Sequence, residues 1–255
     1  MMKSLYLTAA LVSWTSAAPT QTWSPTLSNF YTAVNAQVNA VKANNPFTPP
    51  SCDLLQAEPP TAPTPLPSPD SSWRLVSVVV GRGVQNYSCA LASETVKPVL
   101  VGAIANLYNT SCIAANYPRI LEMIPNLALQ YSLPAKPSAA FEPSNLPLVG
   151  HHYFLANGTP TFDFSMDPTT SIGVAKFKKG FNSTAPASAP KGENEAGDGS
   201  VPWLFLPSIA STQGNVVGVY RLNTAGGSPP TTCQSSPAAF SVQYATEYWF
   251  YTKTD

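Results

Sequence analysis

The stretch formed by residues 216–233 constrains the fold more than any other part of the chain. Residues 216–222 are mostly β-branched or apolar, as in a strand. A Gly-Gly pair at 226–227 predicts a tight loop, and a Pro-Pro pair at 229–230 ends the regular structure. Cys233 follows directly, so this strand can be tied covalently to another segment. We expect the rest of the chain to pair with this strand or to close over it.

The N-terminus predicts export. Lys3 provides a short positive region, residues 5–12 form an apolar run too short to span a bilayer, and small residues at 16–18 offer a cleavage site after Ala18. We therefore expect residues 1–18 to be a signal peptide, with a buried N-terminal helix as the alternative. No later apolar run is long enough for a transmembrane helix, and the C-terminus carries no lipid-anchor signal. The expected product is soluble and extracellular.

The charge balance argues against two classes of partner. The 255 residues include 13 Lys plus Arg and 13 Asp plus Glu, so the formal net charge is zero. A chain without a field of one sign is not steered onto nucleic acid or an anionic membrane, and we expect neither as a partner. Only 10% of residues are charged and 27 are proline, a composition common in secreted proteins.

Glycosylation and disulfides are both expected. Four sequons together with the signal peptide predict a glycoprotein. They begin at Asn86, Asn109, Asn157 and Asn182. Four cysteines in an exported chain predict two disulfides, for which three pairings are possible. We favour Cys89–Cys233, joining an early strand to the end of the Gly-Gly loop, with Cys52–Cys112 holding the N-terminal segment. The cysteine spacing has no CxxC and no nearby histidine, so we expect no zinc and no other metal.

Residues 19–70 predict a helix followed by a strap. Ser24 is a suitable N-cap, Pro25 suits the first helical position, and apolar residues recur at helical spacing to about Lys42. A proline-rich stretch at 49–69 cannot join the interior of a sheet, because proline removes hydrogen-bond donors. We expect an extended strap pinned to the surface by Cys52, with a flexible linker as the alternative.

Residues 71–255 predict a mainly β domain. About nine strand-like runs with turn signals between them favour an antiparallel β-sandwich or a barrel-like domain. These runs are at residues 73–80, 84–91, 151–155, 161–164, 172–177, 201–206, 216–222, 240–245 and 247–252, with a turn or bulge at 81–83. Apolar spacing of three and four predicts short helices at 98–108 and 117–129, the second kinked or broken at Pro125. They would form an insertion at about 96–131. The polar loop at 178–199 is either mobile or functional.

Five sequence blocks carry a resemblance to a known family. They are residues 81–89 (GRGVQNYSC), 150–164 (GHHYF followed by TPTFDF), 197–206 (GDGSVPWLFL), 219–233 (VYRLNTAGGSPPTTC) and 242–251 (VQYATEYWFY). In this order they resemble a family of small secreted proteins, common in filamentous fungi and with bacterial relatives, catalogued as a domain of unknown function. The resemblance implies a β-rich single domain with a signal peptide, and it implies no reaction.

Some fungal members of that family are labelled malate dehydrogenase, and the residues here do not support that activity. A hydride-transfer enzyme needs a glycine-rich turn from strand to helix that brings backbone N–H groups to a pyrophosphate. Residues 81–83 (GRG) lack the third glycine and are followed by a strand. We therefore expect no nicotinamide cofactor, and no other cofactor.

Candidate catalytic groups are few. His151 and His152 are adjacent in a predicted strand, so they point to opposite faces and do not easily share a metal ion. No GxSxG motif occurs. A carboxylate pair for glycoside hydrolysis would come from Asp163, Asp198 and Glu247. The catalytic candidates are His152, Asp198 and Glu247, each with a structural alternative as a strand residue, a turn cap or a surface pair.

Candidate binding groups are arginines and aromatic residues. Arg82 and Arg221 either hold an anionic ligand or pair with a carboxylate such as Asp198 or Glu247. The aromatic residues of the strand blocks form either a sugar-stacking face or an aromatic core. The binding candidates are Arg82, Tyr153, Trp203, Arg221 and Trp249.

Two functions fit these observations. The first is a secreted, disulfide-stabilised glycoprotein with a non-catalytic role, binding an extracellular carbohydrate or a host or cell-wall protein, as an effector does. The second is a secreted hydrolase acting on a polysaccharide or an ester. An exposed aromatic strip would favour the first, and two carboxylates about 5–10 Å apart in a cleft would favour the second. The sequence does not determine the oligomeric state.

Overall fold

A computed structural model describes residues 24–44, 51–131, 133, 140–141, 146–192 and 197–254. The predicted signal peptide, residues 1–18, lies outside the described residues. The strands are β1 (Trp73–Ser88), β2 (Val99–Asn109), β3 (Ala140–Phe141), β4 (Leu146–Phe154), β5 (Pro160–Asp163), β6 (Val174–Lys176), β7 (Phe181–Ser183), β8 (Trp203–Pro207), β9 (Val216–Gly226) and β10 (Ala239–Lys253). The helices are α1 (Pro25–Asn44), η1 (Leu54–Gln56), α2 (Ser111–Asn116) and α3 (Pro118–Ala128).

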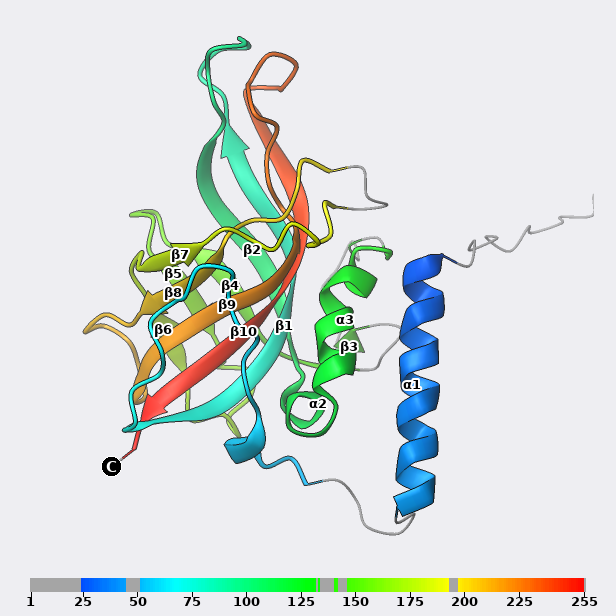
Figure 1. Cartoon of the computed structure of the whole chain (residues 1–255). Helices are drawn as coiled ribbons and strands as arrows, with labels where there is room; N and C mark the ends of the chain where they lie inside the picture. The colour runs from blue at the N-terminus through cyan, green and yellow to red at the C-terminus, as the bar shows by residue number, and fades with distance from the viewer. Residues whose placement is uncertain are drawn as a thin grey trace, which may run out of the picture.

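The strands form one antiparallel sheet in the order β6-β5-β4-β2-β1-β10-β9-β8-β7, with β3 paired to β4 (Figure 1). The sheet is strongly curled. The curl brings Phe162 of β5 edge-on against Phe250 of β10 at a ring distance of 5.3 Å, although three strands separate β5 from β10 in the sheet. An isolated bridge between Phe177 and Ser208 and a few backbone hydrogen bonds, such as that from the Ile209 N–H to the carbonyl of Lys176, join the two sides, and the sheet is not closed into a barrel. The mainly β, antiparallel fold predicted from the sequence is confirmed.

Among the described residues, the sheet has one large apolar core on each face and a small third cluster around Tyr244. Strand alternation assigns neighbouring residues of β10 to different cores. Tyr248 and Phe250 pack inside the curl with residues of β5 and β9, whereas Trp249 and Tyr251 pack on the convex face. The aromatic residues of this strand are therefore used as core on both sides.

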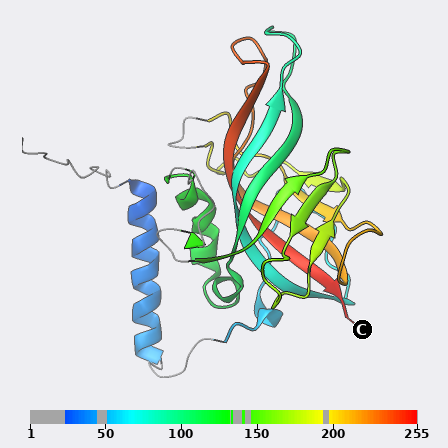
Figure 2. The ribbon, with the colours of Figure 1, turned by 180° about the vertical axis from the view of Figure 1, so that it is seen from behind.

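Helices cover the convex face in two layers. α3 contacts β1, β9 and β10, and α1 lies outside α3, as both views of the ribbon show (Figures 1 and 2). The proline-rich strap runs along the surface and is hydrogen-bonded to the sheet. The Tyr220 hydroxyl donates to the carbonyl of Pro67 at 2.6 Å, and the Thr64 N–H donates to Ser183 Oγ at 2.9 Å. The strap is thus a docked segment, in place of the alternative flexible linker.

The predicted helix at 98–108 is wrong, because this segment is strand β2. The backbone of β2 lies very close to Gly83 of β1. A Cβ placed on Gly83 of β1 would lie 2.8 Å from the Cβ of Ala105 and 1.9 Å from the carbonyl oxygen of Ile104. Pairing with β1 and β4 therefore overrides the helical spacing of its apolar residues. The helical part of the insertion is reduced to α2 and α3, and α3 continues through Pro125.

The predicted turn or bulge at 81–83 is also wrong, because β1 is continuous from Trp73 to Ser88 and its register against both neighbours is regular at 81–83. Gly81 is needed there for space, since a Cβ would lie 2.6 Å from the Tyr248 ring. β1 is the central strand of the sheet, whereas β9, on which the sequence analysis placed the emphasis, lies two positions away between β10 and β8.

Both predicted disulfides are confirmed. Cys89–Cys233 joins the end of β1 to the segment after β9, and Cys52–Cys112 joins the strap to α2. Two disulfides indicate an oxidising environment of the extracellular type. Among the described residues, no helix has the length and apolar character needed to cross a membrane.

Candidate functional site

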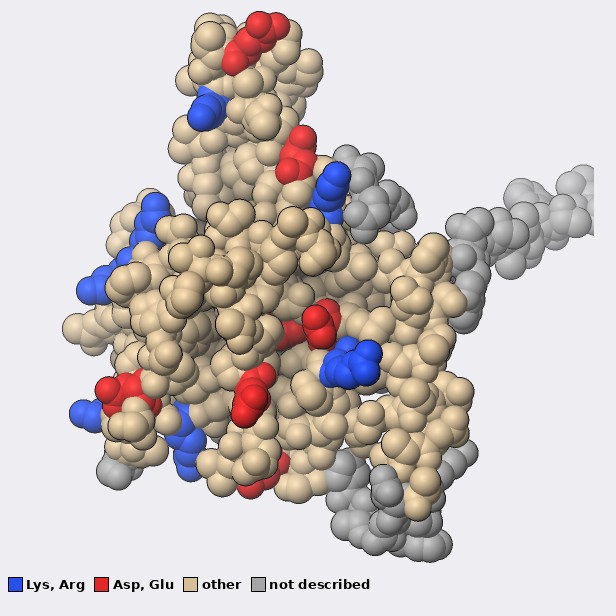
Figure 3. All heavy atoms as spheres, in the orientation of Figure 1, with Lys and Arg blue, Asp and Glu red and all other residues tan. Residues whose placement is uncertain are grey.

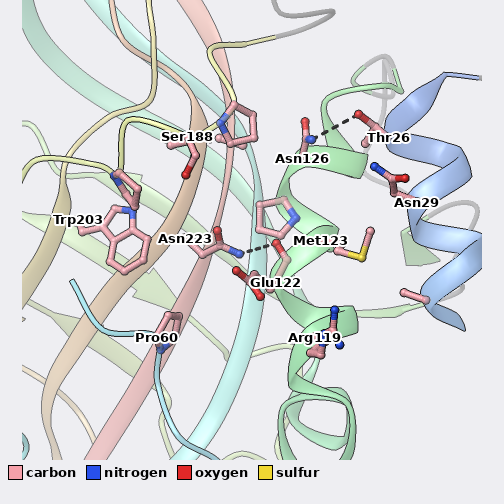
Figure 4. A pocket seen from close by; sticks show the side chains of 16 residues that line it. Thr26, Asn29, Pro60, Arg119, Glu122, Met123, Asn126, Ser188, Trp203 and Asn223 are labelled. Atoms are coloured by element: carbon pink, nitrogen blue, oxygen red, sulfur yellow. Dashed lines mark hydrogen bonds between the residues drawn. The ribbon is translucent and has the colours of Figure 1, made fainter. Parts of the chain in front are cut away.

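A cavity of about 410 Å³ lies between the convex face of the sheet and the helices. Figure 4 shows Trp203 of β8 on one wall and residues of α3 on the opposite wall, with α1 behind α3. Proline, alanine and Met123 line the cavity together with the hydroxyls of Thr26 and Ser188 and with three amides, a guanidinium and a carboxylate. The last five side chains belong to Asn29, Asn126, Asn223, Arg119 and Glu122.

Asn223 connects the sheet to α3 at the centre of this cavity. It lies in a bulge of β9, where the register against β10 shifts between Ala245 and Glu247. Its φ of 46° places it in the left-handed region, which asparagine tolerates better than most residues. The side-chain amide donates to the carbonyl of Glu122 at 2.6 Å and to Glu247 Oε1 at 2.8 Å. The bulge therefore directs an amide away from the sheet and toward the helix.

Glu247 lies behind Asn223 and is 1% exposed. Its second oxygen, Oε2, accepts from the indole N–H of Trp249 at 2.9 Å. Burial raises the pKa of Glu247 to about 7, although the hydrogen bonds from Asn223 and Trp249 favour the charged form. The carboxyl group therefore changes its protonation near neutral pH, at a position next to the cavity wall.

Two residues that line the cavity have polar atoms without a partner. Trp203 is 4% exposed, and its indole Nε1 donates to no acceptor in the described part of the chain. The buried Oδ1 of Asn126 likewise accepts no hydrogen bond there, while the amide nitrogen donates to Thr26 at 3.4 Å. Buried polar groups are almost always hydrogen-bonded. One unpaired donor and one unpaired acceptor therefore lie buried in the walls of one cavity.

The other aromatic candidates do not form an exposed strip. Trp249 is buried in the convex core and donates to Glu247. Tyr153 lies half-buried on the outer side of β4 and is hydrogen-bonded to Asp163, whose pKa is lowered mainly by hydrogen bonding to Ser165. The aromatic density of the sequence is thus explained chiefly by the two cores, and Trp203 alone among these residues reaches the cavity.

His152 and Arg221 lie on the opposite, concave side of the sheet from Glu247. His152 is buried and stacks on Phe162 at 4.0 Å, and its Nδ1 donates to the carbonyl of Thr161 at 2.9 Å. Burial lowers the pKa of His152 to about 4, so the ring is neutral near pH 7. Arg221 donates to the carbonyl of Pro202. The structure therefore does not bring His152 and Glu247 together.

Asp198 and Arg82 also lie apart from the cavity. Asp198 is exposed in a loop whose next residue, Gly199, hydrogen-bonds Lys191. Arg82 is buried on the convex face and donates to the carbonyls of Ala128 and Tyr131 and to the side chain of Gln243. Arg82 thus holds the C-terminal end of α3 against the sheet, which is a structural use of the guanidinium.

The four sequons differ in accessibility. Asn157 and Asn182 are exposed, in a turn and in β7. Asn86 is half-buried in β1 and accepts from Ser241 Oγ at 2.7 Å, and Asn109 accepts from the N–H of Ser111 at 2.9 Å. The exposed pair therefore offers the easier acceptors for a glycan.

Sequence reasoning missed Asn126 and Asn223. For Asn223 a signal existed, because asparagine is a poor strand residue and one inside an otherwise regular strand suggests a bulge. For Asn126 no local signal existed, since its role depends on α3 packing beside β8 and α1.

Residues 69–252 match the model of a family described as "Protein of unknown function (DUF3455)". The chain belongs to this family. The DUF3455 match contains Trp203, Asn223 and Glu247, whereas α1, which adds Asn29 to the cavity, precedes it. The family membership expected from the sequence blocks is confirmed. No curated protein and no solved structure matches the chain.

Proposed function

We propose that this DUF3455 protein is a secreted, disulfide-stabilised glycoprotein that binds an extracellular carbohydrate without catalysis, in the cavity between β8, β9 and α3. The observation that carries the proposal is the unpaired donor Trp203 Nε1 and the unpaired acceptor Asn126 Oδ1 beside one cavity. A sugar hydroxyl can both donate and accept, so one class of ligand could satisfy both atoms.

The remaining lining supports a neutral ligand. Arg119 and Glu122 contribute one charge of each sign, and the other polar side chains are uncharged amides and hydroxyls. Figure 3 shows few charged side chains on this face and no region of one sign. A phosphorylated or polyanionic ligand would need clustered cations. A hydroxyl-rich ligand instead needs paired donors and acceptors next to an apolar wall, which Trp203 and the prolines supply.

The raised pKa of Glu247 is the one observation that favours the alternative, a hydrolase acting on a polysaccharide or an ester. A general acid near pH 7 needs such a pKa. However, both oxygens of Glu247 accept hydrogen bonds from the protein, and the other catalytic candidates lie elsewhere. We therefore place binding first.

The test replaces Trp203 by phenylalanine, which removes the unpaired N–H and retains an aromatic ring. The purified glycoprotein is incubated with chitin, β-glucan, cellulose and pectin, and with their soluble oligosaccharides. Depletion, calorimetric binding and released sugar are all measured. We expect binding without release, and a loss of about fivefold to tenfold in affinity for Trp203→Phe, as for one neutral hydrogen bond.

Trp249→Phe is the matched control, because its indole N–H already has a partner in Glu247. Both substitutions shorten a buried ring and should lower the stability, and Trp249→Phe should lower it more, because it also leaves Glu247 without one of its donors. If no glycan binds, or if Trp203→Phe binds as well as the wild type, the proposal fails. Release of sugar that Glu247→Gln abolishes would instead establish the hydrolase.

A further inference from the structure

The upper part of β2 is an open sheet edge. β2 pairs with β4 only from Ile104 to Tyr108, because β4 ends at Phe154 and the chain then turns back. Val99, Leu100 and Gly102 pair with β1 on one side, with a bulge at Val101, and no described strand pairs with residues 99–102 on the other side. Their outward N–H and C=O groups are therefore available to another strand.

The same edge is apolar and uncharged. Val99 and Val101 are 61% and 57% exposed, and Leu91, Leu100 and Ile104 of the same region are also exposed. β2 contains no charged residue and no proline, two of the features by which sheet edges are usually protected, and its one such feature here is a bulge at Val101. A cluster of exposed apolar side chains beside free backbone groups is typical of a strand that pairs with another chain.

This edge belongs to an arm that projects from the rest of the molecule in Figures 1 and 2. The arm consists of the upper parts of β1, β2 and β10, with β1 in the middle. Cys89–Cys233 links it to the segment after β9, and Tyr87 stacks on Phe240 at 5.5 Å. Because the arm is braced in this way, pairing would require little ordering of the edge.

We propose that β2 pairs in an antiparallel manner with β2 of a second copy of this chain, across a two-fold axis. A second copy fits because identical uncharged strands place apolar side chains against apolar side chains. The opposite edge of the arm, residues 239–243 of β10, exposes Ala239 and Ser241 and lacks this apolar row. Pairing β2 with that edge would leave the apolar side chains unmatched and would build an open chain of molecules, whereas pairing β2 with β2 closes at two copies.

The test is sedimentation of the purified glycoprotein over a range of concentrations, before and after enzymatic removal of glycans. The contact is small, so we expect a dimer with a dissociation constant in about the micromolar range. Val101→Lys places two like charges near the axis and should weaken the dimer by about tenfold or more. The matched control is Met166→Lys, because Met166 is also about half exposed, at 51%, in a turn outside the arm.

Thermal unfolding distinguishes lost pairing from lost folding, and Val99→Lys provides a second variant if Val101→Lys unfolds. The dimer should persist in Met166→Lys and weaken by about tenfold or more in the edge variants, with their unfolding temperature retained. A protein that stays monomeric at every concentration overturns the proposal, as does a dimer that both edge variants leave intact. Neither result depends on whether the cavity binds a carbohydrate.

Discussion

At the scale of single residues, two buried groups on opposite faces of the sheet have opposite effects on how the unfolding free energy changes with pH. Burial raises the pKa of Glu247 from 4.5 to about 7 and lowers the pKa of His152 from 6.5 to about 4. Between these values the folded state keeps a proton on Glu247 that the unfolded state releases, so rising pH is destabilising. The folded state lacks the proton that unfolded His152 binds, so rising pH is stabilising. The two effects nearly cancel between pH 4.5 and 6.5.

Single substitutions should expose each effect. Relative to the wild type, the unfolding free energy of Glu247→Gln should rise by about 3 kcal/mol as the pH increases from about 4.5 to 7, because the penalty of ionising Glu247 is absent. Relative to the wild type, the unfolding free energy of His152→Gln should fall by about the same amount from about pH 4 to 6.5, because this variant lacks the stability that the wild type gains there. Urea unfolding at each pH measures both. The exposed Glu58→Gln is the control, and parallel pH profiles in all three variants would contradict the assignment.

At the scale of elements, α3 is held by polar contacts near its middle and at its C-terminal end. Asn223 donates to the carbonyl of Glu122, and Arg82 donates to the carbonyls of Ala128 and Tyr131 near the C-terminal end. These contacts position the helical wall of the cavity relative to β8 and β9. The cavity therefore depends on residues that do not line it.

Arg82→Ala should lower the unfolding free energy by about 3 kcal/mol, because it leaves buried carbonyl groups without a donor. Arg82→Lys keeps the charge but lacks the planar fork, so an intermediate loss is expected. In Arg82→Ala, hydrogen exchange should accelerate more in α3 than in β1, relative to the wild type. Uniform exchange of both elements, or full stability of Arg82→Ala, would show that Arg82 does not anchor α3.

At the scale of the whole molecule, each disulfide joins segments that the sheet alone leaves apart. Cys89–Cys233 spans 144 residues of sequence and braces the arm, and Cys52–Cys112 spans 60 residues and holds the strap beside α2. Both act mainly by restricting the unfolded chain.

Replacing Cys89 and Cys233 together by serine should lower the unfolding free energy by about 5 kcal/mol in the chain-entropy model, and replacing Cys52 and Cys112 by about 4 kcal/mol. Denaturant titration of the two double variants measures this order. The first variant should also weaken the proposed dimer, because its arm loses the brace, while the second should not. A larger stability loss for the shorter loop would contradict the entropic account.

Sequence by itself determined the local and covalent features of this protein. Strand alternation, turn residues and cysteine count depend on nearest neighbours or on simple pairing, and they led to the mainly β antiparallel fold, α1, the docked strap and both disulfides. The family blocks led to DUF3455.

The tertiary structure alone decided that residues 99–109 are a strand, since their apolar spacing fits a helix and only the pairing with β1 and β4 selects β2. It alone placed His152 and Glu247 on opposite faces and assembled Trp203, Asn126 and Asn223 around one cavity. Those arrangements depend on the curl of the sheet and on helix packing, which are set by contacts between residues far apart in the chain.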